Sequence, residues 1–239
     1  MIAAHIIPKS LYPKTENGDR MMKILSVKGE KPTVDLRNGF YDKNLVCREC
    51  EDYFDPLDSY ASKFIPSITH YPLLTTSDGL RFREIDAHDA KKLKLFLLSV
   101  LWRSHATERS EFNRVALGPY ADKLKKLIEN NDPDSKNEFP AVLFTFKPHE
   151  NPELDFSNIA MSPIHRHFNN GRVYELWLFG CLAWIYVGGG NPGKMFENGS
   201  VREGQNLYIL EKDARDSPYQ NTIRDTIRVQ DKFNSKRAK

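Results

Sequence analysis

The sequence of 239 residues predicts an α+β protein, in which a small N-terminal module precedes a larger domain of helices and an antiparallel sheet. Before residue 131, apolar side chains recur at three- and four-residue spacing, which is typical of helices that pack against a core. After residue 138, apolar runs alternate with turn residues, which is typical of strands. We therefore divide the chain into a first part, residues 1–65, and a second part, residues 66–239.

The first part begins with a short apolar segment, residues 1–7, which a proline ends. A polar segment rich in lysine, glycine and proline follows and extends to Gly39. A helix is expected over residues 50–64 because its apolar side chains share one face, and these are Tyr53, Phe54, Leu57, Tyr60, Ala61 and Phe64. Pro66 ends this helix, and Pro56 could split it.

Two helices are expected early in the second part. Asp86 is a candidate N-cap for a strongly apolar helix over residues 87–107, which we expect at the centre of the core. A shorter helix over residues 119–130 begins with Pro119, a residue favoured in the first turn of a helix. Residues 66–84, before both helices, are expected to form loop and short strand.

The later elements are expected to be strands and one terminal helix. The strand candidates are residues 141–147, 158–168, 173–187 and 207–210. Asn170-Gly171 lies between two of these runs and predicts a hairpin turn. From about Ser217 onward, apolar residues follow a helical period among basic ones, which predicts a basic amphipathic C-terminal helix.

Composition predicts a globular protein that lies inside the cell. Hydrophobic residues make up 40% of the chain, and the longest apolar run, residues 176–187, is too short to span a bilayer. The N-terminus lacks the pattern of a signal peptide. Two of the only three cysteines form a Cys-x-x-Cys pair, which indicates a reducing compartment rather than a disulfide framework. We therefore expect a cytoplasmic protein with no membrane partner.

Charge is distributed unevenly although the formal net charge is only +3. Residues 1–41 contain seven basic and four acidic residues, residues 42–58 contain two and six, and residues 213–239 contain seven and four. Basic segments therefore flank an acidic patch around the Cys-x-x-Cys pair. The pattern fits either an ordinary solvated surface or a metal-binding carboxylate patch that phosphate-binding arms border.

The most informative residues of the first part follow a recognisable order. His5 lies in the segment Ala-Ala-His-Ile-Ile-Pro, and about forty residues later Asn44-Leu45 precedes Cys47 and Cys50, with Glu51 directly after them. This order resembles the motif of the HNH nucleases, the His-Me finger or ββα-metal family. The resemblance implies a small treble-clef-like module that holds one divalent ion, Mg²⁺ or Mn²⁺, between two strands and a helix.

The resemblance also implies a role for each of these residues. His5 matches the general base that deprotonates a water molecule, and Asn44 matches the residue that orients this base. Cys47 and Cys50 match half of the zinc site that fixes the start of the helix in zinc-containing members. Glu51 stands where the motif normally ends with a histidine, and its carboxylate suits Mg²⁺ or Mn²⁺ as a ligand.

The sequence departs from the family pattern at two points. Ala4 occupies the position of an acidic metal ligand, and the first Cys-x-x-Cys pair of the zinc site is missing. Three explanations remain open: the true start lies upstream of Met1, the fold holds no ion, or a distant histidine completes the site. We favour an upstream start, because the segment around His5 is typical of the middle of a motif.

Two longer segments are similar to uncharacterised bacterial HNH-like proteins, namely residues 47–64 and residues 95–119. The resemblance implies a metal-dependent DNA endonuclease or nickase, an effector of a defence system or mobile element that works with a protein partner. The alternative is a catalytically inactive subunit that keeps the fold and binds nucleic acid or another protein. Ala4 favours this alternative.

Other readings of single residues also remain open. A Cys-x-x-Cys pair occurs in thioredoxin-like redox proteins. His165 and His167 lie two apart in an expected strand, so they share one face and could bind a metal, although two solvated polar side chains are the simpler interpretation. Arg103 and His105 at the end of an apolar helix could line a pocket or contact nucleic acid, and core packing explains them equally well.

Overall fold

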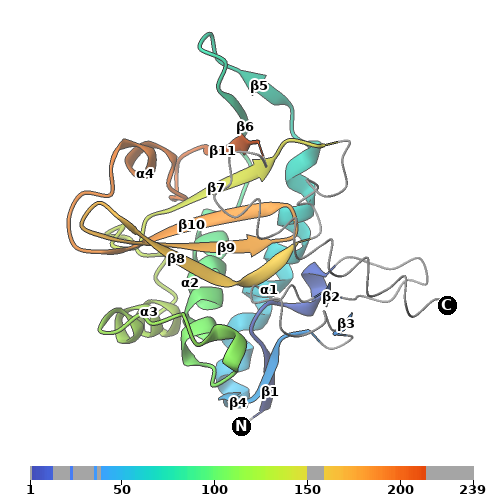
Figure 1. Cartoon of the computed structure of the whole chain (residues 1–239), viewed down its shortest axis with the longest axis vertical. Coiled ribbons are helices and arrows are strands. Elements are labelled where there is room, and N and C mark those ends of the chain that lie inside the picture. The colour runs from blue at the N-terminus through green and yellow to red at the C-terminus, as the bar shows by residue number, and fades with distance from the viewer. Residues whose placement is uncertain (1, 13–21, 24–34, 37–38, 150–158, 214–239) are drawn as a thin grey trace, which may run out of the picture.

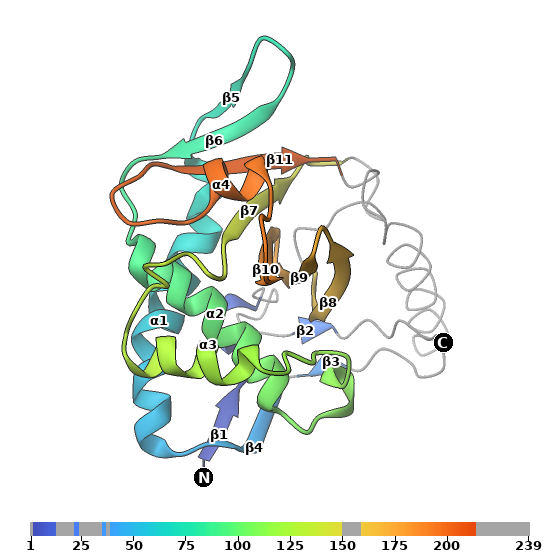
Figure 2. The same cartoon turned by 90° about the vertical axis from the view of Figure 1, so that its left-hand side faces the viewer.

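The computed structural model describes residues 2–12, 22–23, 35–36, 39–149 and 159–213. Within these residues the protein is α+β, as the sequence predicts, with one large sheet and four α-helices. Figure 2 shows the helices α1 (Arg48–Ser67), α2 (Ala90–Ala106) and α3 (Tyr120–Glu129) together on one side of the sheet. The expected C-terminal helix from Ser217 lies outside the described residues.

The sheet contains seven of the described strands in the order β5-β6-β11-β7-β10-β9-β8. Their bounds are Leu73–Thr75 (β5), Arg81–Ile85 (β6), Ala141–Phe146 (β7), Ala160–Phe168 (β8), Gly171–Leu178 (β9), Cys181–Gly188 (β10) and Leu207–Lys212 (β11). The expectation of a wholly antiparallel sheet is wrong for one pair, because β7 and β11 are parallel. After β10 the chain passes through the short helix α4 (Lys194–Gly199) and enters β11 on the side of β7 that faces away from β10. Strand β11 is therefore parallel to β7, and its direction is opposite to that of β10.

The expectation of one long strand over residues 173–187 is also wrong. This run contains parts of two strands, β9 and β10, which pair antiparallel across a turn at Phe179-Gly180. Phe179 and Gly180 both have positive φ angles, 50° and 89°, as a tight hairpin turn requires. Both strands are buried almost throughout, so the apolar pattern continues through the turn and hides it. The hairpin expected near Asn170 is present and joins β8 to β9.

The helices agree with the sequence except at their ends. Helix α1 continues through Pro56, whose side chain is exposed, so water can reach the carbonyl that loses its intrahelical partner. Helix α2 begins at Ala90 rather than at residue 87, because Asp89 and not Asp86 is the N-cap: its Oδ1 accepts a hydrogen bond from the Lys92 N–H at 2.9 Å.

A short N-terminal strand pair lies at the opposite end of the molecule from the β5–β6 hairpin (Figure 1). Strand β1 (Ile2–His5) pairs antiparallel with β4 (Tyr41–Val46), and α1 follows β4 directly. The strands β2 (Met22–Lys23) and β3 (Asp35–Leu36) form a separate pair. Ala4 of β1 and Phe54 of α1 belong to the same buried cluster as the core of α2. The division of the chain into two domains at residue 65 stays a prediction.

Helix α2 is the centre of the core, as the sequence predicts. Its buried apolar residues are Leu93, Leu95, Phe96, Leu97, Leu98, Val100 and Leu101. Side chains around the whole circumference of α2 are buried because α1 and α3 pack on it and the sheet covers its other side. Each fully buried side chain of this size contributes roughly 1.5–3 kcal/mol to the stability of the fold. Burial of α2 therefore stabilises the elements that pack on it.

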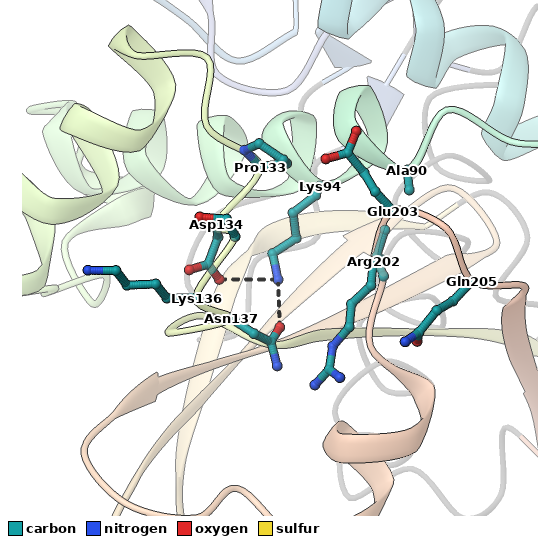
Figure 3. A pocket seen from close by; sticks show the side chains of 11 residues that line it. Ala90, Lys94, Pro133, Asp134, Lys136, Asn137, Arg202, Glu203 and Gln205 are labelled. Atoms are coloured by element: carbon teal, nitrogen blue, oxygen red, sulfur yellow. Dashed lines mark hydrogen bonds and ion pairs between the residues drawn. The ribbon is translucent and has the colours of Figure 1, made fainter.

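A buried ion pair joins α2 to the loop after α3. The Lys94 side chain is 1% exposed, and its Nζ lies 3.4 Å from Asp134 Oδ2. The same Nζ donates a hydrogen bond of 3.5 Å to Asn137 Oδ1 (Figure 3). Burial lowers the pKa of Lys94 to about 8, although the Asp134 carboxylate opposes this shift.

The lowered pKa of Lys94 predicts that stability depends on pH in the alkaline range. Above about pH 8 and below the ordinary lysine pKa, the unfolded chain binds more protons at Lys94 than the folded one, so the free energy of unfolding rises with pH. Lys94→Met removes this contribution. Urea denaturation between about pH 7.5 and pH 9.5 should therefore show a steeper rise for the wild type than for Lys94→Met.

The exposed Lys126→Met is the control and should keep the wild-type slope. Parallel pH profiles for the wild type and Lys94→Met would contradict the prediction.

Candidate functional site

The candidate site is built on the strand pair β1–β4 and on the first turns of α1. His5 is the last residue of β1 and pairs with Tyr41 of β4, and the two rings lie 6.4 Å apart between centroids. The chain then turns away from β4, after a hydrogen bond of 2.9 Å from the Ile6 N–H to the Phe40 carbonyl. Because the backbone on both sides of His5 is paired, the position of its side chain relative to β4 is set by the strand register.

A buried arginine of α2 ties the end of β1 to α1. Arg103 is 0% exposed, and its Nη1 donates a 2.7 Å hydrogen bond to the carbonyl oxygen of His5. The same guanidinium forms a bidentate pair with Asp58 of α1, with bonds of 2.9 Å and 2.8 Å, and lies 4.7 Å over the Phe54 ring. One side chain therefore fixes His5, α1 and α2 relative to one another.

The sequence alone does not reveal this role of Arg103. Two interpretations fit the sequence equally well, namely that Arg103 packs in the core or that it lines a pocket or contacts nucleic acid. A signal was present, because Arg103 falls one turn after Ser99 in the buried stripe of an apolar helix. A charge in such a position needs a partner of opposite charge, and Asp58 is that partner.

Glu51 in the first turn of α1 has a buried carboxylate oxygen. Its Oε2 accepts no hydrogen bond from any residue that the structure describes. Burial raises the pKa of Glu51, the Arg103 charge lowers it, and the carboxylates of Asp58, Asp55 and Asp52 raise it further. A partly buried carboxylate with a free oxygen is a suitable ligand for a hard divalent cation.

Because the raised pKa makes its charge unfavourable, Glu51 should destabilise the metal-free protein at neutral pH. Glu51→Gln removes the charge and keeps the shape, so we expect its Tm without metal to be higher by about 1 °C, a small value because solvent screens part of the charge. Mn²⁺ should raise the Tm of the wild type and not that of Glu51→Gln.

Thermal unfolding of the wild type, Glu51→Gln and the exposed control Glu49→Gln, with and without Mn²⁺, checks this. Equal Mn²⁺ responses in the wild type and Glu51→Gln would exclude Glu51 as a ligand.

Asn44 is exposed on β4, next to a small hydrogen-bonded corner. Its backbone N–H donates to Asp42 Oδ1 at 2.8 Å, and the Thr107 hydroxyl donates to Asp42 Oδ2 at 2.6 Å. Burial alone would raise the pKa of Asp42, but these hydrogen bonds outweigh it and lower the pKa. The hydrogen bond to the backbone of His5 comes from Arg103, so the expected orienting role of Asn44 stays a prediction.

Cys47 and Cys50 lie side by side at the start of α1, with their Sγ atoms 3.1 Å apart. Cys47 is the N-cap, and its sulfur accepts a hydrogen bond of 3.4 Å from the Cys50 N–H. Hydrogen bonds from Cys50 lower the pKa of Cys47, whereas the same contact raises the pKa of Cys50. The two thiols are of the right type for two of the four ligands that a structural zinc site needs.

The remaining ligands of a metal site do not come together within the described residues. No group of three or more histidine, cysteine or acidic side chains is placed there to hold an ion. Ala4 is 0% exposed and packs in the core, Asp52 and Asp55 are exposed, and Asp58 is bound to Arg103. The three explanations for the incomplete motif therefore remain open.

The other histidine candidates make contacts of their own. His105 Nδ1 lies 3.1 Å from the Val115 carbonyl oxygen, a contact that fixes the loop after α2. The His165 ring packs on Tyr174 at 5.5 Å between centroids, and His167 is exposed on the same strand, β8.

Comparisons with protein-family models, with curated proteins and with solved structures give no significant match to this chain. Among the described helices, none has the length and apolar character needed to cross a membrane.

Proposed function

We propose that the chain is a metal-dependent phosphodiesterase of the HNH type that nicks or cleaves DNA. The observation that carries the proposal is the Glu51 carboxylate, whose buried oxygen lacks a partner among the described residues. It lies in the first turn of a helix that directly follows two antiparallel strands, and the first of these strands ends at His5. The pairing of two strands with a helix after the second supports the proposal, whereas Ala4 departs from the pattern that the resemblance implies.

In this proposal each side chain has a distinct task. Mg²⁺ or Mn²⁺, when bound, stabilises the negative charge that develops on the phosphate and the leaving oxygen. Glu51 would hold this ion, together with groups that the described residues do not supply. The imidazole of His5 would take the proton of the attacking water, and Asn44 would orient it. Arg103 positions His5 by holding its carbonyl oxygen at 2.7 Å and does not touch the substrate.

Cys47 and Cys50 would fix the start of α1 by sharing a zinc ion with two further ligands. This would hold Glu51, which directly follows Cys50, at a constant distance from β1. The role as an effector of a bacterial defence system or mobile element, with a protein partner, rests on the sequence resemblance alone.

A second candidate function is a non-catalytic subunit that keeps this fold and binds nucleic acid or a protein partner. The burial of Ala4 favours it, because an apolar contact replaces the acidic ligand of the family pattern. Such a subunit would bind DNA with an affinity that falls steeply with salt and would not depend on His5.

The test is cleavage of supercoiled plasmid with Mg²⁺ or Mn²⁺. We expect the wild type to produce nicked circles, and His5→Ala to lose about 10²–10⁴-fold in rate, as the removal of a general base does. The exposed His70→Ala is the matched control and should cut at the wild-type rate.

If the wild type binds plasmid but does not cut it with either ion, the catalytic proposal fails and the binding subunit is favoured. Cutting that persists in His5→Ala would exclude His5 as the base.

A further inference from the structure

A pocket of about 540 Å³ lies between the start of α2, the loop over residues 131–138 and the segment over residues 201–205. Its lining includes Lys94, Asp134, Asn137, Arg202 and Gln205. Figure 3 shows Lys94 extending from α2 toward Asn137, with Arg202 approaching from the opposite segment. The volume falls within the range typical of small-molecule sites in proteins.

The charges at this pocket are not balanced. Lys94 and Arg202 are close enough for the Arg202 charge to lower the pKa of Lys94. The only partner of Lys94 with a negative charge in the described residues is Asp134, at 3.4 Å. Arg202 Nε is buried and has no hydrogen-bond partner among the residues that the structure describes. Burying a guanidinium N–H without an acceptor costs free energy. An anion beside Arg202 would supply the acceptor and remove this cost.

The loop on the other side of the pocket is held in a fixed shape. Asn131, Asp134 and Asn137 all have positive φ angles, at 52°, 62° and 52°. The Asp134 carboxylate accepts hydrogen bonds of 2.8 Å from the backbone N–H groups of Glu138 and Phe139. Asn and Asp adopt this left-handed backbone at little cost, so the loop keeps this shape without strain. The pocket is therefore formed before any ligand binds.

We propose that this pocket binds a small molecule through a carboxylate group that pairs with Arg202 and faces Lys94. The five charged residues that line the pocket carry one surplus positive charge, which a carboxylate neutralises, and they are Lys94, Lys136, Arg202, Asp134 and Glu203. A phosphate monoester would bring a charge of about −1.5 to −2 and leave the site negative. The two N–H groups on one edge of a guanidinium also match the two oxygens of a carboxylate. This inference does not depend on the proposed nuclease function.

The test is a thermal-shift titration of the full chain with acetate and benzoate, at constant ionic strength set with chloride. Acetamide serves as the neutral probe and inorganic phosphate as the more highly charged one. At about tenfold excess over its Kd, a carboxylate that binds here should raise the Tm by about 3 °C. Arg202→Gln should abolish this shift, whereas Arg114→Gln, an exposed arginine outside the pocket, should keep it.

The ¹H–¹⁵Nε resonance of Arg202 gives a second readout that does not require a destabilising variant. It should move on addition of the carboxylate and not on addition of acetamide. A Tm shift that survives in Arg202→Gln, or a complete lack of shift with both carboxylates, would overturn the proposal. A larger, Arg202-dependent shift with phosphate would overturn the assignment of a carboxylate.

Discussion

Asp58→Ala should destabilise the protein by about 3 kcal/mol or more, because it leaves the guanidinium of a fully buried arginine without its negative partner. Arg103 is 0% exposed, and Asp58 supplies two of its hydrogen bonds, at 2.9 Å and 2.8 Å. The remaining acceptors, the His5 carbonyl and Ser99, are neutral and cannot balance the charge. Urea denaturation with a two-state fit measures the change in the free energy of unfolding.

Asp55→Ala is the matched control, since it removes a carboxylate from the same helix at an exposed position. It should change stability by no more than about 0.5 kcal/mol. The double variant Arg103→Met/Asp58→Leu should recover part of the loss, because a packed apolar pair replaces both charges together. Equal effects of Asp58→Ala and Asp55→Ala would show that the ion pair does not hold β1 and α1 together.

Asp134→Ala should cost about 3 kcal/mol or more, for three reasons that add at one position. It leaves the Lys94 amine buried without its carboxylate at 3.4 Å. It removes the acceptor for the backbone N–H groups of Glu138 and Phe139. It also places alanine at a φ of 62°, where aspartate is tolerated better.

Thermal or urea denaturation of Asp134→Ala and of Glu203→Ala measures this difference. Glu203 lines the same pocket but is exposed, so its removal should leave stability nearly unchanged. Because Lys94 has a pKa of about 8 and is mostly neutral at about pH 9 even in the wild type, the ion pair contributes less there, and the loss should be smaller than at neutral pH. A loss of less than about 1 kcal/mol at neutral pH would contradict the assigned role of the pair.

The sequence predicts those parts of the fold that local patterns control. The stripe of Leu93, Phe96, Leu97 and Val100 is enough to place α2 at the centre of the core, because few helices are apolar on so many sides. The turn at Phe179-Gly180 could not be placed in the same way, since the flanking strands are buried on both faces and their apolar run continues through it. The parallel pairing of β7 with β11 depends on where the chain returns after α4, which no local pattern contains.

The candidate site also combines features that local sequence patterns predict with features that only the tertiary fold determines. His5, Asn44, Cys47, Cys50 and Glu51 could be singled out because their order along the chain carries the resemblance. The contact between Arg103 and the carbonyl of His5 joins residues 98 positions apart, so it follows only from the tertiary fold. The same holds for Lys94 and Asn137, which are 43 positions apart and line the pocket beside Arg202.

We propose that a divalent ion binds between the end of β1 and the first turn of α1, with Glu51 as a ligand. Electron paramagnetic resonance of free Mn²⁺, titrated against the full chain, tests it most directly because bound Mn²⁺ loses its sharp signal. We expect one Mn²⁺ to bind per wild-type chain, with an affinity at least about tenfold weaker in Glu51→Gln and unchanged in Glu49→Gln. Mn²⁺ that stays free with the wild type, or that binds equally to Glu51→Gln, would contradict it.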